Sequence, residues 1–539
     1  MKKQIRIVFR SISILCLILT LMACDKSVLN EKPLSFLSPD VTLVNNAGFQ
    51  SAITSLHRNM REIIGGNTPF TYWCLYYGTD IGTIGTETFF IDYNTQLTPT
   101  FQAVTAFWDW GYLNIFPIAN QIIDYAQRPT AVWTDEKQKN AVIAEARFFR
   151  AYALNILTNL YGDVVIVDKL ATEPKVDYQL SKRKDVLSFA KADLEFASQW
   201  LPLTESLPGR ISKNAADHLL AEVNISLGDF DKAIEAATSV ISSGRNQLMI
   251  QRFGTQKSKS GDVFSDMWKD GNQNRSGGNL ENIWTIQYEF LTPGGVPVSA
   301  TFGKSWLRAW GPRYFETKDP DNKSGMLLAD SLGRGVAWVR PSNHILYNIW
   351  KDSPNDMRNS KYNIRRKWYY NNPISKYYLQ EVKKHANLDT LYSGVWPSFI
   401  KIEGLSLAGA ANGGTFVDWP MMRLAETYLL RAEAFLLKGD KQKAADDINV
   451  VRSRANALPV SATQVDLDYI LDERLRELII EEPRRLTLSR MGKLVERVKK
   501  YNGFATTINS IQDKNAIFPL PQKFIDANFG SKINQNKGY

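Results

Sequence analysis

Cysteine is scarce in this sequence: its 539 residues include three, Cys16, Cys24 and Cys74. Cys16 and Cys24 belong to an N-terminal segment of basic and apolar residues, so Cys74 has no other cysteine with it in the rest of the sequence. A single thiol cannot form an intramolecular disulfide, so a disulfide framework is excluded. Cys74 stands among aromatic and aliphatic residues at 72–77. Free cysteine in such a setting is usually an inert core residue, and we predict that it packs in the core.

Histidine is also rare, and the common catalytic motifs are missing. The four histidines are far apart in sequence, which argues against a metal site or a catalytic triad. The chain has no His-Glu-x-x-His, Cys-x-x-Cys, P-loop or Gly-x-Ser-x-Gly pattern. We therefore predict a protein that is not an enzyme, with no catalytic residues, no metal and no cofactor.

Acidic pairs offer a weaker alternative, because a glycosidase needs only two well-placed carboxylates. The sequence contains 55 aspartates and glutamates, so a lipid-anchored glycosidase stays open. The pairs Glu481-Glu482 and Asp446-Asp447 lie on amphipathic stretches, whose charged faces are usually solvated. We interpret them as exposed surface residues.

Long apolar runs are missing beyond the N-terminus, where no stretch reaches the roughly 18 residues that predict a membrane-spanning helix. The N-terminal residues 1–24 have a different composition. Four basic residues precede an apolar run at 12–22, which is too short to span a bilayer and is typical of a signal peptide. The run ends in Leu21-Met22-Ala23-Cys24, which resembles a bacterial lipobox. We predict a signal peptide over 1–23 and a lipid on Cys24 that anchors the protein stably.

A strong charge imbalance is absent too. The formal net charge of +10 falls to +6 when the four basic residues of the predicted signal peptide are removed. Such a mild excess does not indicate nucleic-acid binding. Aromatic residues, in contrast, make up 12% of the chain, with 14 tryptophans. Rings beyond the needs of a core often line ligand surfaces, which favours a binding protein.

Helical periodicity covers two parts of the chain and is weak between them. Residues 24–45 are polar and Pro-punctuated, which predicts an extended leader. We expect a single domain over 46–539, with a helical scaffold at about 46–244 and 416–539 and an irregular, aromatic insertion at about 245–415. Two stretches, 215–241 and 425–451, each join two Ala-rich helices through a Gly-Asp turn, as tetratricopeptide-type pairs do. The predicted fold class is therefore mainly α.

Several segments form a recognisable series in order along the chain. They are 29–33 with 36–38, 145–151 with 160–164, the two helical pairs, 356–358, 423–426 with 431–434, and 535–539. Together they resemble the SusD/RagB family of outer-membrane lipoproteins, and the resemblance extends over nearly the whole mature chain. Departures are local: Glu482-Pro483 stands where glycine and a polar residue are common, and Thr487 replaces a frequent aspartate.

The resemblance implies a SusD-like helical fold and a lipid-anchored protein at the outer membrane, facing the cell exterior. Members of this family bind glycans, or in some cases peptides, and deliver them to a TonB-dependent transporter of the SusC type without cleaving them. We therefore expect a glycan ligand, a SusC-like partner and no nucleic acid. A peptide-binding, RagB-like protein and a scaffold that binds only other proteins are the open alternatives.

Two aromatic segments are the candidate ligand sites, because rings suit the apolar faces of sugars while polar side chains orient them. The first lies in the insertion, where Gly311-Pro312 argues against one continuous helix and favours a loop that carries rings outward. The second is the loop 82–100, where the family resemblance also places ligand. The competing interpretation is that the rings fill the core. The candidates are Trp306, Trp310, Tyr314, Trp338, Phe89, Phe90, Tyr93 and Asn94.

Basic and aromatic residues alternate in the stretch 357–385. In a protein outside the cell, one interpretation of this composition is a binding site for an anionic polysaccharide, because arginine pairs with carboxylate or sulfate groups. We favour the alternative, a hairpin with a solvated charged face.

The sequence 319–330 matches the ligand pattern of a calcium-binding loop only poorly. Asp319, Asp321 and Asp330 fall on positions 1, 3 and 12. However, Lys323 occupies position 5, and Gly325 is at position 7 instead of 6. The pattern favours a plain acidic turn.

Overall fold

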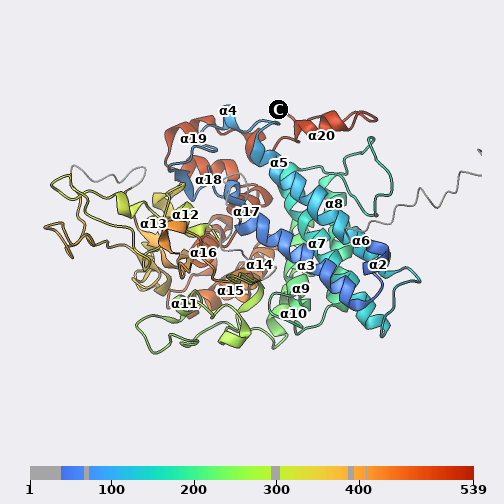
Figure 1. Cartoon of the computed structure of the whole chain (residues 1–539), viewed down its shortest axis with the longest axis horizontal. Coiled ribbons are helices and arrows are strands. Elements are labelled where there is room, and N and C mark those ends of the chain that lie inside the picture. The colour runs from blue at the N-terminus through green and yellow to red at the C-terminus, as the bar shows by residue number, and fades with distance from the viewer. Residues whose placement is uncertain (1–37, 66–71, 293–303, 386–393, 408) are drawn as a thin grey trace, which may run out of the picture.

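The computed structural model describes residues 38–65, 72–292, 304–385, 394–407 and 409–539 (Figure 1). The predicted signal peptide, Cys24 and most of the predicted leader lie outside these residues. In the described part, helices carry most of the regular structure, and the strands form three two-stranded antiparallel sheets. This confirms the mainly α fold class.

The N-terminal part forms a layer of helices around one long central helix, α7 (Glu136–Tyr161). This helix begins after Asp135, whose side chain accepts a hydrogen bond from the backbone N of Gln138, as an N-cap does. It ends at Gly162, whose φ of +78° suits glycine. Helices α3, α6 and α8 pack around it. The other helices here are α2 (Pro39–Thr42), α3 (Asn46–Gly65), α4 (Tyr93–Gln96), α5 (Gln102–Asp109), α6 (Phe116–Ala126) and α8 (Arg183–Trp200).

Both predicted helical pairs are present. Helices α9 (Lys213–Leu227) and α10 (Phe230–Ser242) are joined at Gly228, and α14 (Leu424–Leu437) and α15 (Lys441–Arg454) at Gly439. Both glycines have positive φ, +82° and +94°, which lets the chain reverse between closely packed helices. Helix α10 packs against α14, so the two pairs form one scaffold although a long segment separates them in sequence (Figure 1).

In the described residues between the two pairs, the helices and strands are short. They are α11 (Val263–Asp266), α12 (Trp306–Trp310) and α13 (Asn343–Leu346), with the strands β2 (Asn282–Ile286), β3 (Val339–Pro341), β4 (Ile364–Arg365), β5 (Ser398–Phe399) and β6 (Trp419–Arg423). Strand β2 pairs with β6, β4 with β5, and β3 with β1 (Gly82–Ile84) near the N-terminus. Helix α12 ends at Gly311, as Gly311-Pro312 predicts, yet one short helix does form before it.

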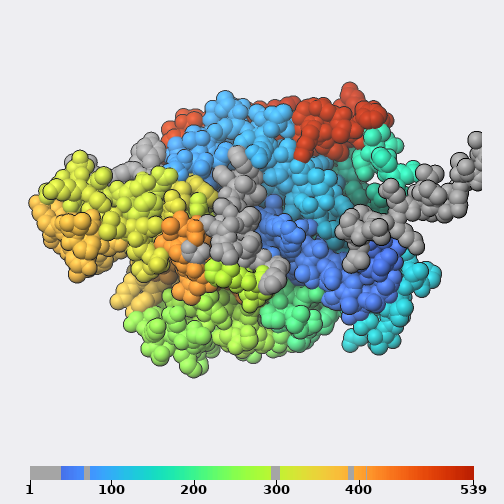
Figure 2. All heavy atoms as spheres, in the orientation of Figure 1, coloured from blue at the N-terminus to red at the C-terminus, as the bar shows by residue number. Residues whose placement is uncertain are grey.

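The C-terminal helices return to the N-terminal part of the chain. Figure 2 shows the red C-terminal atoms lying against blue atoms of the N-terminal part along one edge. Asp80, fully buried, binds Arg484 at 2.7 Å and Arg497 at 2.8 Å between side-chain oxygen and nitrogen atoms. These ion pairs join the N-terminal part of the described chain to the C-terminal helices. The helices are α16 (Leu467–Leu478), α17 (Arg484–Arg490), α18 (Leu494–Tyr501), α19 (Ala505–Ser510) and α20 (Gln522–Ala527).

A layer of buried ion pairs lies between α16, β6 and the segment 353–365. Its centre is Glu477, which is fully buried and bonded to Arg358, Arg423 and Arg454. The expected exposure of Glu481-Glu482 is corrected here. Glu481 pairs with Arg423 and Lys401, and Glu482 with Arg474 and Arg484, in each case with buried side chains. Asp446 is exposed as expected, whereas Asp447 is buried against Arg431.

Cys74 is buried in the main hydrophobic core, as predicted. Burial raises the pKa of its thiol to about 12, which keeps it protonated and inert. Among the described residues, no helix is long and apolar enough to cross a membrane.

Candidate functional site

Three of the candidate rings in the insertion belong to the core. Trp306, Trp310 and Tyr314 are 0%, 1% and 1% exposed. Trp306 packs edge-on against Trp73, with ring centroids 4.6 Å apart, and stacks on Trp419 at 5.2 Å. The expectation that these rings face a ligand is corrected, because partner rings from distant parts of the chain cover them.

The rings of the second candidate segment divide into two groups. Phe90 and Tyr93 are buried, and Arg485 lies over the Phe90 ring and donates a hydrogen bond to the Tyr93 hydroxyl at 2.9 Å. They anchor the loop and are not open to a ligand. Phe89 is partly exposed and Asn94 is exposed, so these two remain candidates.

Trp338 is an intermediate case. Its side chain is 7% exposed, and the Arg308 guanidinium lies 5.4 Å from its ring centroid. Its backbone oxygen accepts a hydrogen bond from the backbone N of Glu87. This contact places Trp338 beside the loop 82–100, where it serves mainly as packing.

The loop 82–100 leads directly into α5. Phe89 packs on Phe101, with ring centroids 5.9 Å apart, and Phe101 is the N-cap residue of α5. At its other end, α5 continues into a π-helical segment, Trp110–Ile115. Such segments are rare and are frequent at functional sites. Helix α5 therefore connects the loop that carries Phe89 to this segment.

A pocket of ≈ 420 Å³ opens beside the π-helical segment. One wall is formed by Trp108, Tyr112 and Phe116, and another by Phe524 of α20. The ring centroids of Trp108 lie 4.5 Å from Tyr112 and 4.6 Å from Phe524. The remaining wall is the segment after α7, including Val165, Val167, Leu170, Ala171 and Tyr178.

Hydrogen bonds hold the pocket open in this shape. The Tyr112 hydroxyl donates to the backbone O of Val165 at 2.7 Å and accepts from its backbone N at 2.9 Å. Asn120 donates to the backbone O atoms of Val167 and Lys169 at 2.9 and 3.1 Å. Burial raises the pKa of Tyr112, so this hydroxyl stays protonated. The wall after α7 is thereby fixed against α6 before any ligand arrives.

The rim of the pocket carries charge. Asp109 and Lys523 form an ion pair across it, joining α5 to α20, and Lys169 lies on the opposite wall. A pocket with ring walls and a few polar groups at its mouth suits an amphipathic ligand. The rings offer area to an apolar face, and the carboxylate and ammonium groups can orient hydroxyls.

The sequence does contain a signal for this pocket. Trp108, Tyr112 and Phe116 are spaced four apart, which places them on one helical face. That spacing alone cannot be distinguished from a core stripe. Phe524, the ring that completes the site, comes from the far end of the chain and has no local signal.

The remaining charged motifs act structurally. In 357–385, the interpretation as a solvated hairpin holds only in part. Lys367 is exposed and pairs with Glu381, which also forms an antiparallel bridge with Tyr369. Arg358, Trp368 and Tyr370 are instead buried, and Arg365 pairs with Glu403 outside the stretch. Asp319 accepts hydrogen bonds from the backbone N atoms of Asp321 and Lys323, which is the geometry of a plain turn. No group of three potential metal ligands occurs among the described residues.

Comparison with known proteins gives consistent matches over most of the chain. The model of the SusD family matches residues 347–539, and the model described as "Starch-binding associating with outer membrane" matches residues 35–225. The SusD-like protein P2 of Formosa agariphila is 26% identical over 98% of this chain and 99% of its own.

Solved structures show the same fold. A SusD homologue from Bacteroides thetaiotaomicron has a TM-score of 0.70 and 20% identity, covering 93% of this chain and 98% of that one. Surface glycan-binding protein A from the same species, in complex with laminarihexaose, has a TM-score of 0.68 and 17% identity, covering 91% and 99%. Two family models at opposite ends of the chain, a full-length relative and a shared fold all agree: the chain belongs to the SusD-like family.

Proposed function

We propose that this protein is a non-catalytic surface lipoprotein that binds an extracellular glycan and delivers it to a TonB-dependent transporter of the SusC type. The observation that carries the proposal is the pocket at the end of α5, walled by Trp108, Tyr112 and Phe524 and rimmed by Asp109 and Lys523. Support comes from the fold shared with a protein whose structure contains laminarihexaose. A lipid on Cys24 would hold the protein beside its transporter.

The proposed mechanism is reversible capture. A sugar ring lays its C–H face on Phe524 and Tyr112, the partly exposed rings of the wall, which removes apolar surface from water. Trp108 is 4% exposed and packs behind these two rings. Its hydroxyls exchange water for Lys523 and Asp109, which sets the orientation of the ring. Because the wall is already fixed by hydrogen bonds, little ordering entropy opposes binding. No bond is broken, so the glycan is released intact.

Replacing Phe524 by alanine is expected to weaken glycan binding by about tenfold, because one stacking face worth about 1 kcal/mol or more is lost. The measurement is isothermal titration of the soluble chain beginning at Asp25, with a hit selected from a glycan array. Phe529→Ala is the matched control: that ring is 81% exposed, follows α20 and does not line the pocket. Equal affinity of the two variants would place the ligand elsewhere.

The loop that leads into α5 is the second candidate, favoured by the exposure of Phe89 and Asn94. A loss of binding in Phe89→Ala, with Phe524→Ala unaffected, would move the site to this loop. Release of reducing ends from any hit would support the glycosidase alternative. If the array gives no hits and peptides do bind, the RagB-like alternative replaces the glycan.

A further inference from the structure

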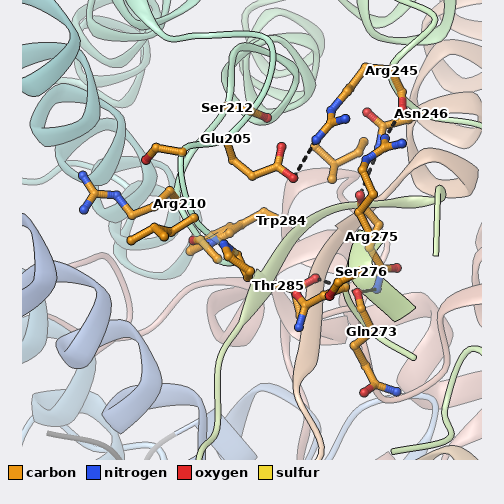
Figure 3. A pocket seen from close by; sticks show the side chains of 17 residues that line it. Glu205, Arg210, Ser212, Arg245, Asn246, Gln273, Arg275, Ser276, Trp284 and Thr285 are labelled. Atoms are coloured by element: carbon orange, nitrogen blue, oxygen red, sulfur yellow. Dashed lines mark hydrogen bonds and ion pairs between the residues drawn. The ribbon is translucent and has the colours of Figure 1, made fainter. Parts of the chain in front are cut away.

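A second, more polar pocket of ≈ 130 Å³ lies on a different part of the scaffold (Figure 3). It is bounded by the segment 205–212 before α9, the turn after α10, a 3₁₀ turn at Arg275–Gly277 and strand β2. It shares no lining residue with the pocket beside α5. A single water needs roughly 15 Å³ of such space, so the cavity admits a larger polar group.

Two guanidinium groups meet in this pocket. Arg275 donates a hydrogen bond to the backbone O of Arg245, and both side chains are half-buried. Burial, followed by the charge of Arg245, lowers the pKa of Arg275. Arginine nonetheless stays protonated in proteins. The pair is therefore a concentration of positive charge in partly enclosed surroundings, where electrostatic interactions are stronger than in water.

Among the residues that the structure describes, one carboxylate, Glu205, lies within ion-pair distance of either group. Glu205 accepts a hydrogen bond from Arg245 at 2.8 Å, as the dashed line in Figure 3 marks. In the described part of the chain, no carboxylate lies within ion-pair distance of Arg275. Arg210 also lines the pocket but turns its guanidinium away, and Glu145 neutralises it through three hydrogen bonds. The pocket thus holds one uncompensated positive charge.

Further donors face the same space. The hydroxyls of Ser212 and Ser276 line the pocket and hydrogen-bond to no described residue. A planar guanidinium fork with neighbouring hydroxyl donors matches a carboxylate or sulfate group, whose oxygens accept bidentate hydrogen bonds.

We propose that this pocket binds an oxyanion, a sulfate or carboxylate group, through Arg275 and Arg245. The group belongs either to a free anion or to an acidic ligand that carries it. Glu205 occupies one Arg245 donor and competes with the incoming anion. The site does not depend on the proposed capture of glycans at α5, and separate residues test it.

Two substitutions shift binding in opposite directions. Arg275→Gln removes the uncompensated charge and is expected to weaken the binding of sodium sulfate by about tenfold or more, the effect of a lost charge-assisted hydrogen bond. Glu205→Gln removes the competing charge and is expected to tighten it. The measurement is isothermal titration with sulfate against sodium chloride of equal ionic strength. Arg58→Gln, at an exposed ion pair on α3, serves as the control and should bind like the unmodified chain.

A sulfated oligosaccharide, its desulfated counterpart and a uronic acid then identify the source of the oxyanion. At least tenfold tighter binding of the sulfated or uronic form than of inorganic sulfate assigns the group to an acidic glycan. Equal affinities assign it to a free ion. The proposal is overturned if none of these probes binds, or if Arg275→Gln and Glu205→Gln bind sulfate as the unmodified chain does. Binding of the neutral glycan, tested at Phe524, is independent of both results.

Discussion

Replacing Glu477 by glutamine is expected to lower the free energy of unfolding by about 3–5 kcal/mol, the usual effect of removing one partner from a buried charge network. The side chain of Glu477 is fully buried. One oxygen accepts from Arg423 at 2.8 Å and from Arg454, and the other from Arg358 at 3.0 Å. Glutamine keeps the shape but loses the charge, so three guanidinium groups lose part of their compensation in a medium that water does not reach.

Urea unfolding followed by circular dichroism measures this effect. The matched control is Glu62→Gln, which removes one partner of an ion pair whose side chains are more than half exposed. Its expected cost is about 0.5 kcal/mol or less. If the two variants lose similar stability, the buried network contributes no more to the free energy of unfolding than a surface pair does, and the prediction is wrong.

Stability is also expected to fall as the pH drops from about 4.5 towards about 2. Burial by itself would raise the pKa of Glu473, but the charges of Arg358, Arg476 and Arg452 outweigh it and lower the pKa from 4.5 to about 2. The pKa of Glu426 falls to about 2 in the same way, through His218 and Arg474.

The direction of this pH effect on stability follows from proton uptake. Between these pH values the unfolded chain binds protons that the folded chain does not, so acid favours unfolding. Each such carboxylate contributes about 3 kcal/mol at neutral pH, and this contribution is fully present well above pH 4.5. Urea unfolding at a series of pH values tests the prediction. Glu473→Gln, although less stable at pH 7, should show a smaller loss on acidification. A midpoint that does not change between pH 7 and pH 3 would contradict it.

Local signals were sufficient for much of the fold. The Gly-Asp turns at Gly228 and Gly439 predict a chain reversal between two helices from local sequence alone. Both predicted pairs are present in the structure. Cys74 was correctly placed in the core from its apolar neighbours. These features depend on residues close together in sequence, where periodicity and turn chemistry carry the information.

The functional surface was harder to predict because burial depends on distant partners. The aromatic segment around Trp306 predicts a ring that faces a ligand. Trp73 and Trp419 cover this ring instead, and neither is near it in sequence. The pocket at α5 needs Phe524 from the last helix to complete its ring wall. The amphipathic context of Glu482 predicts a surface residue, but its side chain is buried between Arg474 and Arg484.

The ion pairs of Asp80 with Arg484 and Arg497 also set the order in which the protein can fold. These contacts span 404 and 417 residues. Closing so large a loop is entropically unfavourable, and contacts between residues far apart in sequence slow folding. A growing chain that has not yet reached Arg497 has an Asp80 carboxylate with an incomplete set of counter-ions, which resists burial. We therefore expect the hydrophobic core around Asp80 to close only after α17 and α18, which carry Arg484 and Arg497, have been synthesised.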